Sequence, residues 1–192
     1  RFDKLVLIAT DAKASPWTIA IDETQRMAIR ADAGYGQRRA DAALDGMAAA
    51  RAIGLLSYRG PGGYNRSQAD APGAPAPGEH RACSYQRYQG EKLCRRFNAY
   101  SYVSILNSFD THDIGRGRGG VEAALASIKA ETIVTGISSD IIFTPAEMRL
   151  LADRIPGAVY AEIDSDFGHD GFLVEHARLN AILKPFIEKI RQ

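Results

Sequence analysis

The chain has 192 residues, enough for one domain with a sizeable core, and its 45% hydrophobic and 24% charged residues are those of an ordinary soluble globular protein. The formal net charge of +1 gives no electrostatic reason to expect a nucleic acid or an anionic membrane as partner. Cys83 and Cys94 fit neither a zinc motif nor a redox pair, which favours reduced thiols in a cytosolic protein, and we find no apolar run of membrane-spanning length and no visible signal peptide.

A short apolar run opens the chain, and two predicted helices follow it. Residues 5–9 end at a polar Thr-Asp pair, which is typical of a strand covered on both faces in a parallel α/β sheet; a short buried helix is the alternative. We expect a helix over residues 16–32, where Pro16 suits the first turn, and a second helix over residues 39–58. Residues 60–63 hold one proline and three glycines and are expected to end the second helix.

The middle of the chain alternates loops and predicted helices. Residues 66–80 are rich in Pro, Gly and Ala and predict a mobile surface loop. Helices are expected over residues 84–97 and 99–109, and a short one over residues 121–128. Before the short helix, the run from Gly115 to Gly120 fits neither the Walker nor the dinucleotide spacing of a phosphate loop, so we interpret it as a flexible hinge.

The last third of the chain predicts strands that alternate with helices. Strands are expected over residues 131–137 and 159–163, with helices over 144–154 and 172–190. Together with residues 5–9, these two strands would form a parallel sheet, because a strand, a helix and a second strand in this order make a crossover connection. The fold class is therefore α/β.

The predicted elements divide the chain into a core strand at residues 1–10, a helical insertion at 11–120 and the rest of the core at 121–192. Three parallel strands would leave an unpaired strand edge, so we expect a sheet partner, either an earlier segment or a separate chain. The sequence begins with Arg1 rather than Met and leads directly into the first strand, which we interpret as a cut inside a domain.

An aspartate and a histidine follow two successive strands. Asp140 comes just after the strand at 131–137, and His169 lies in the loop after the strand at 159–163. Because the carboxyl ends of parallel strands meet at one edge of a sheet, the carboxylate can orient the imidazole there, as in a Ser-His-Asp triad. The alternatives are a helix N-cap for Asp140 and an ordinary loop histidine for His169.

The nucleophile of such a triad should precede the aspartate and sit in a Gly-x-Ser-x-Gly turn. Ser138 follows Gly136 at the right spacing, but Asp140 stands where the second glycine is needed, so Ser138 is a poor candidate. Ser57, Ser101 and Ser165 lack this context entirely. We therefore expect the nucleophile on polypeptide outside these 192 residues.

Several short motifs, in order along nearly the whole chain, resemble the later half of the homoserine O-acetyltransferase family. They are TQR at 24–26, ARAI at 50–53, SYR at 57–59, YQGEK at 88–92, RFNAYSY at 96–102, GISSDIIFTP at 136–145 and GHD at 168–170. The resemblance implies the C-terminal portion of an α/β-hydrolase fold with a helical lid insertion.

The resemblance also implies an activity: transfer of an acetyl group from acetyl-CoA to the hydroxyl of L-homoserine, a step of methionine biosynthesis in the cytoplasm. It makes His169 the general base and Asp140 the residue that orients it, with the serine on a missing N-terminal half. It places Arg51 at the carboxylate of the acceptor, Tyr58 in the acceptor pocket and Asp170 at the ammonium group. No metal and no permanently bound cofactor are implied, and the enzyme would be a homodimer through its lid helices.

Two alternative functions and two questions about single residues remain open from the sequence. The acyl donor or acceptor could differ, for example succinyl-CoA, serine or a bulkier alcohol. The chain could also be a non-catalytic half that serves in binding or assembly. For Arg51 a solvated helix charge is the alternative, and Arg116 or Arg118 could touch the phosphates of coenzyme A.

Overall fold

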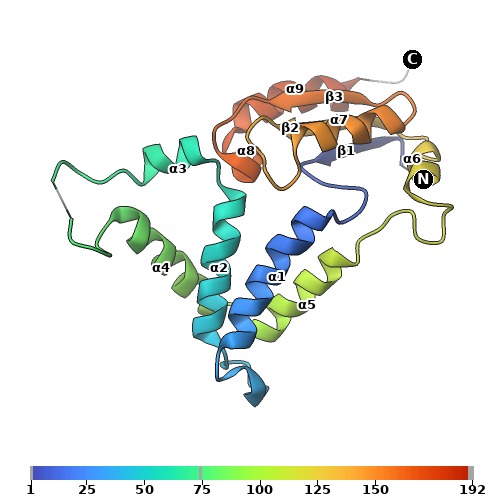
Figure 1. Ribbon diagram of the computed structural model, residues 1–192. Helices are drawn as coiled ribbons and strands as arrows, with labels where there is room; N and C mark the ends of the chain where they lie inside the picture. Colours follow the sequence, from blue (N-terminus) through green and yellow to red (C-terminus); the bar gives the residue numbers. More distant parts are fainter. Residues whose placement is uncertain (1, 74, 190–192) are drawn as a thin grey trace. The chain divides into compact units, whose positions relative to one another are not determined.

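The structure is a computed structural model that describes residues 2–73 and 75–189. The chain divides into two compact units, each made of segments that are distant in sequence (Figure 1). Unit 1 consists of Arg1–Lys13, Tyr58–Gly63 and His112–Gln192, and unit 2 consists of Ala14–Ser57 and Tyr64–Thr111. The expected lid insertion at residues 11–120 overlaps unit 2, but its role as a lid stays a proposal.

Unit 1 contains a parallel sheet of three strands in the order β1-β2-β3. The strands are β1 (Lys4–Ile8), β2 (Glu131–Ile137) and β3 (Val159–Ile163). Val6 pairs with Ile133 across the first ladder, and Thr135 pairs with Ala161 across the second. β2 lies between the two other strands and is buried from its second residue onward, which explains its apolar sequence. The predicted α/β class and parallel order are confirmed.

Helices cover both faces of this sheet. On one face, α6 (Val121–Ala126) and α7 (Pro145–Arg154) contribute Leu125 and Met148 to a core that includes Val134. On the other face, α8 (Gly171–Val174) and α9 (His176–Glu188) pack against Ile137 and Ile163 (Figure 1). Two-sided coverage leaves the carboxyl ends of the strands as the edge where polar side chains can gather.

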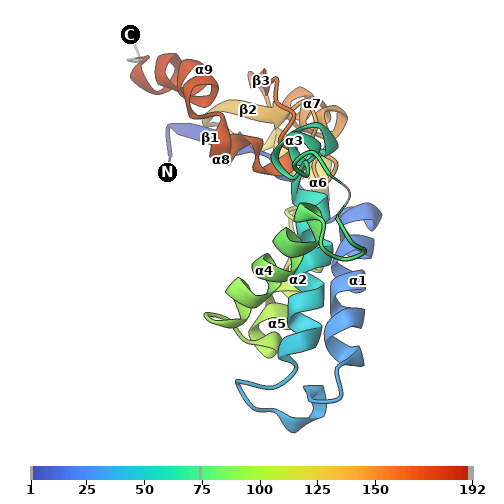
Figure 2. The same cartoon turned by 90° about the vertical axis from the view of Figure 1, so that its left-hand side faces the viewer.

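Unit 2 is helical. It contains α1 (Pro16–Ala31), a 3-10 turn (Tyr35–Gln37), most of α2 (Leu44–Tyr58), α4 (Arg81–Cys94) and α5 (Ala99–Asp110). Figure 2 shows α1 and α2 running side by side. Their shared core is built around side chains that are almost fully buried: Ile29, Met47, Ala50, Leu93, Ala99 and Val103.

Two of the predicted helices and one predicted break differ from the structure. The helix expected over residues 39–58 begins at Leu44, because Ala43 has a φ of 56° and so lies in the left-handed region. Residues 60–63, predicted to break the chain, open the short helix α3 (Pro61–Ser67), since proline is well suited to the first helical turn. The helix expected over 172–190 is two helices separated at Glu175, whose ψ is 50°, and Ile190 lies outside the described residues.

Candidate active site

The turn after β2 presents a carboxylate that is bonded to the backbone on one side. The N–H of Asp140 donates to the carbonyl of Ile137 at 3.1 Å, which closes the turn. Its Oδ1 accepts the N–H groups of Ile142 and Phe143 at 2.8 and 3.1 Å, and the side chain is fully buried. The N-cap of α7 is Thr144, in a capping box with Glu147, so the alternative of Asp140 as the N-cap is wrong.

The loop after β3 brings an imidazole to this carboxylate. His169 lies in a short 3-10 turn, Gly168–Asp170, and its Nδ1 lies 2.9 Å from Oδ2 of Asp140. Because a carboxylate only accepts hydrogen bonds, this contact assigns the proton to Nδ1, and in the neutral imidazole Nε2 is then the acceptor. The predicted meeting of these two side chains is present, and 20% of the histidine side chain remains exposed.

Aromatic rings surround the imidazole. The ring centres of Phe143 and Phe172 lie 5.4 and 5.5 Å from that of His169, and the ring of Tyr58 lies at 6.3 Å. Phe143 follows the Asp140 turn and Phe172 is the second residue of α8, so the segments after β2 and β3 supply the pair and two of the three rings, while Tyr58 comes from the end of α2. Such walls strengthen the electrostatic contact between carboxylate and imidazole.

Residues 58–63 pack against the backbone of the histidine loop. A Cβ added to Gly168 would lie 2.4 Å from the N of Gly60, and a Cβ on Gly60 would lie 2.3 Å from the carbonyl O of Asp166. The φ of Gly168 is +67°, a conformation that side chains also disfavour. The N–H of Gly63 donates to the carbonyl of Asp166 at 3.0 Å, so backbone joins backbone at this contact.

Asp170, the residue after His169, forms an ion pair. Nε of Arg59 lies 3.2 Å from a carboxylate oxygen of Asp170. The sequence gives no reason to assign Arg59 a role, although Arg59 is the last residue of the SYR motif that contains Tyr58. Asp170 therefore adjoins both the imidazole and a guanidinium, and its predicted role at an ammonium group stays a proposal.

Arg51, Ser138 and two further histidines have their own surroundings. Arg51 is half-buried on α2 in unit 2. Ser138 is occupied with the backbone of Ser165, whose N–H it accepts at 2.9 Å. His176 is exposed at the start of α9, and the ring of His112 contacts the carbonyl of Asp11 at 3.0 Å. The predicted role of Arg51 stays a proposal.

The glycine-rich run from Gly115 to Gly120 is a sequence of turns. Gly117, Gly119 and Gly120 have positive φ, which only glycine adopts without strain. The guanidinium of Arg118 donates to the carbonyl of Ile114 at 2.7 Å. The contact of Arg116 or Arg118 with phosphates stays a proposal.

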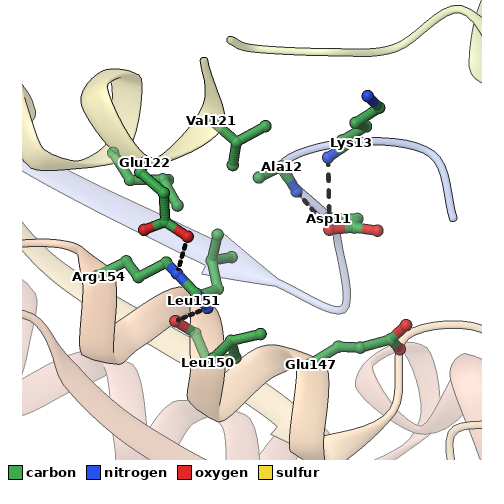
Figure 3. Close-up of a pocket in the computed structure, with 10 residues that line it drawn as sticks. Asp11, Ala12, Lys13, Val121, Glu122, Glu147, Leu150, Leu151 and Arg154 are labelled. Atoms are coloured by element: carbon green, nitrogen blue, oxygen red, sulfur yellow. Dashed lines mark hydrogen bonds and ion pairs between the residues drawn. The ribbon is translucent and has the colours of Figure 1, made fainter. Parts of the chain in front are cut away.

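A cavity of about 330 Å³ in unit 1 lies apart from the pair (Figure 3). Asp11, just after β1, lines it together with residues of α6 and α7, and neither Asp140 nor His169 does. Burial raises the pKa of the Asp11 carboxyl, against the partial lowering by the N–H groups of Lys13 and Ala12. Lys13 and Arg154 on its wall are paired with Asp113 and Glu122.

The described residues contain neither a cluster of metal ligands nor a membrane-spanning helix. Among residues 2–73 and 75–189, no group of three or more His, Cys, Asp or Glu side chains is placed to hold a metal ion. No helix in the same ranges is both long enough and apolar enough to cross a membrane.

No family model matches the chain, but individual proteins do. It is 44% identical over 186 residues to a homoserine O-acetyltransferase of Cyclobacterium marinum, with 97% of this chain and 52% of that protein covered. It is 42% identical over 188 residues to one of Thermus thermophilus, with 97% of this chain and 47% of that protein covered. The chain thus spans about half the length of these curated relatives, and it matches their C-terminal part.

Solved structures agree on the fold. A homoserine O-acetyltransferase of Bacillus anthracis superposes with a TM-score of 0.85 at 16% identity, over 97% of this chain and 53% of that one. Esterase E22 gives the same TM-score and identity over 97% and 54%. A marine metagenome protein described as an alpha/beta hydrolase enzyme gives 0.66 at 18% identity over 99% and 58%. The chain therefore has the fold of the C-terminal portion of an α/β-hydrolase, and in sequence it matches the corresponding part of homoserine O-acetyltransferases.

Proposed function

We propose that this chain supplies the histidine base, and the aspartate that orients it, of an acyltransferase that moves an acetyl group from acetyl-CoA to the hydroxyl of L-homoserine. The observation that carries the proposal is the 2.9 Å contact between His169 and the buried carboxylate of Asp140. The similarity to homoserine O-acetyltransferases over 97% of the chain indicates which reaction the pair would serve. By the same resemblance we expect methionine biosynthesis as the pathway and a cytoplasmic homodimer as the working form.

The mechanism uses the free Nε2 of His169 twice. A serine on polypeptide outside the 192 residues would lose its hydroxyl proton to Nε2 and attack the thioester carbonyl, and that proton would pass to the departing sulfur of coenzyme A. Nε2 would then take the hydroxyl proton of homoserine, whose oxygen attacks the acetyl-serine ester, and the proton returns to the serine oxygen. Asp140 stabilises the imidazolium in both halves of the cycle and keeps Nδ1 as the protonated nitrogen.

The acceptor would be recognised by charge. The carboxylate of Asp170, one residue after the base, suits an ammonium group, and it also lies 3.2 Å from Nε of Arg59. Tyr58, whose ring lies 6.3 Å from that of His169, would form part of the acceptor pocket. Arg51 as the partner of the acceptor carboxylate rests on the resemblance alone, as does the role of the helical insertion in excluding water.

The reaction is tested with two donors and two acceptors. We expect acetyl-CoA with homoserine to give O-acetylhomoserine, and succinyl-CoA or serine to react far more slowly. The assay needs the polypeptide that carries the nucleophile, so we expect residues 1–192 alone to aggregate and to transfer no acyl group. Full turnover by residues 1–192 alone would contradict the proposal, and release of coenzyme A without an acetylated product would point to hydrolysis instead.

The base is tested with two histidine variants in the active enzyme. His169→Ala should lower kcat by roughly 10⁴-fold or more, as expected for loss of a triad member. His176→Ala is the matched control, since this histidine is exposed on α9, and it should leave most of the activity. Equal losses in both variants would overturn the assignment of the base.

A further inference from the structure

One serine hydroxyl connects the turn after β2, which holds Asp140, with the loop after β3, which holds His169. The Oγ of Ser139, in the turn after β2, donates to the carbonyl of Ser165 at 2.5 Å. The same oxygen accepts the N–H of Gly168 at 2.9 Å. A serine hydroxyl has one proton and two lone pairs, so it can make both bonds at once. The turn is therefore fixed to the histidine loop at both ends of residues 165–168.

The position of the Ser139 hydroxyl in the chain lets it affect the distance between Asp140 and His169. Ser139 directly precedes Asp140, and Gly168 directly precedes His169. The hydrogen bond from Gly168 thus links the residues next to the two members of the contact between Nδ1 and Oδ2. A shift of the loop away from Ser139 would carry the imidazole away from the carboxylate.

Near Gly168, few other hydrogen bonds connect the histidine loop with the turn after β2. Ser138 contacts only the start of the loop: its Oγ accepts the N–H of Ser165 at 2.9 Å and lies 3.2 Å from the carbonyl of the same residue. The backbone of Gly168 itself is in the left-handed region, with a φ of +67°. Its N–H bond to Ser139 is what ties this conformation to the turn that holds Asp140.

We propose that Ser139 is a positioning residue, which holds the histidine loop so that the imidazole of His169 stays within hydrogen-bond distance of Asp140. The inference rests on the proposed function, because its effect on rate presumes that His169 is the base. Ser139 acts on the backbone before His169 and does not contact the imidazole in the hydrogen bonds that the structure gives.

The test compares neighbouring serines in the complete enzyme, with the nucleophile present. Ser139→Ala should lower kcat by about 10- to 100-fold, the order expected for a misplaced catalytic group, with the KM for acetyl-CoA unchanged. Ser138→Ala removes the same group one residue earlier and should keep kcat within about threefold of wild type. Ser139→Thr keeps the hydroxyl and should restore most of the rate. If Ser139→Ala does not fold, Ser139→Cys replaces it, because a thiol fills the site but bonds weakly.

A second measurement observes the contact directly. The Nδ1 proton of His169, assigned by its absence in His169→Ala, should give a downfield proton resonance in wild type and in Ser138→Ala. It should broaden or disappear in Ser139→Ala and return in Ser139→Thr. An unchanged resonance and an unchanged kcat in Ser139→Ala, or equal losses in the two alanine variants, would overturn the proposal.

The two proposals can fail separately. If the wild-type enzyme transfers no acetyl group while the resonance still depends on Ser139, the proposed reaction is wrong and the positioning role stands. If the enzyme transfers the acetyl group and neither the rate nor the resonance depends on Ser139, only the positioning role is wrong.

Discussion

Polar side chains of the two units have different kinds of partner in two well-connected places. In unit 1, the carboxylate of Asp140 accepts backbone N–H groups of its own turn, and the hydroxyl of Ser139 accepts the N–H of Gly168 on the neighbouring loop. In unit 2, the buried guanidinium of Arg26 contacts two other side chains, Glu23 on its own helix and Asp110 on α5, at 2.5 and 2.6 Å. Backbone partners fix a site at the ends of strands, whereas side-chain partners join two helices.

The network of unit 2 also holds more carboxyl groups than guanidinium groups: Asp22, Glu23 and Asp110 stand near Arg26 and Arg30. The hydroxyl of Tyr102 donates to Gln25 at 2.6 Å, and Gln25 in turn donates to Asp22 at 3.3 Å. Burial and the nearby carboxyl of Asp110 raise the pKa of Asp22 to about 7, although Arg26 lowers it in part. The raised pKa means that the Asp22 carboxyl of unit 2 loses its proton near neutral pH. In unit 1, by contrast, a hydrogen bond between two side chains joins Asp140 and His169.

The largest effect on stability is expected at the backbone contact between Gly168 and Gly60 in unit 1. Gly168→Ala should destabilise the protein by about 3 kcal/mol, through the left-handed φ and through overlap with Gly60. Gly117→Ala is the matched control, because its φ of +69° is nearly the same but no atom lies within 4 Å of the added Cβ. It should cost about 1–2 kcal/mol. Denaturant unfolding measures both, and equal losses would show that the contact with Gly60 contributes nothing.

A smaller effect is expected at Asp170, and it should appear in binding. Asp170→Ala should raise the KM for homoserine about 10- to 50-fold, the loss expected for one charge-assisted hydrogen bond, with the KM for acetyl-CoA unchanged. The variant should also lose its preference for homoserine over 4-hydroxybutyrate, which lacks the ammonium group. An unchanged homoserine KM would argue that Asp170 serves only to hold Arg59.

The smallest effect concerns the acid pair of unit 2. The pKa of Asp22 is raised in the folded protein, so the folded state binds its proton more tightly and stability falls as pH rises from about 4 to about 7. Asp22→Asn should remove this loss and stabilise unit 2 by about 1–2 kcal/mol at pH 8, reduced from the full linkage value because the carboxyl is only half-buried.

The fluorescence of Trp17 can follow this change, because it is the single tryptophan of the chain and lies on α1. Thermal unfolding should separate wild type from Asp22→Asn more at pH 8 than at pH 5, because most of the window in which stability falls lies between these two values. A wild-type protein that is equally stable at both values would contradict a raised pKa at Asp22.

The sequence was most informative where local rules decide the structure. The bounds predicted for β2 and β3, residues 131–137 and 159–163, are those of the structure, since short apolar strands stop sharply at polar turns. The meeting of Asp140 and His169 followed from parallel topology alone. These features depend on neighbours in sequence and on the general rule that parallel strands end at one edge.

Contacts between distant segments were not visible in the sequence. The pairing of Arg59 with Asp170 and the approach of Gly60 to Gly168 each join residues about a hundred positions apart, and no local pattern marks them. The hydroxyl of Ser139 was likewise passed over, because a serine in a turn is common and only the distance to Gly168 distinguishes this one. The break between α8 and α9 at Glu175 has no proline or glycine at that position that would have predicted it.

The discontinuous make-up of the two units has a consequence for limited proteolysis. A single cut among residues 68–73 would leave an N-terminal fragment with β1 and α1 and a C-terminal fragment with β2 and α5. Each fragment would contain segments of both units, so a single cut would not separate one unit from the other. The two pieces should stay associated under native conditions and separate only in denaturant, as complementing fragments do.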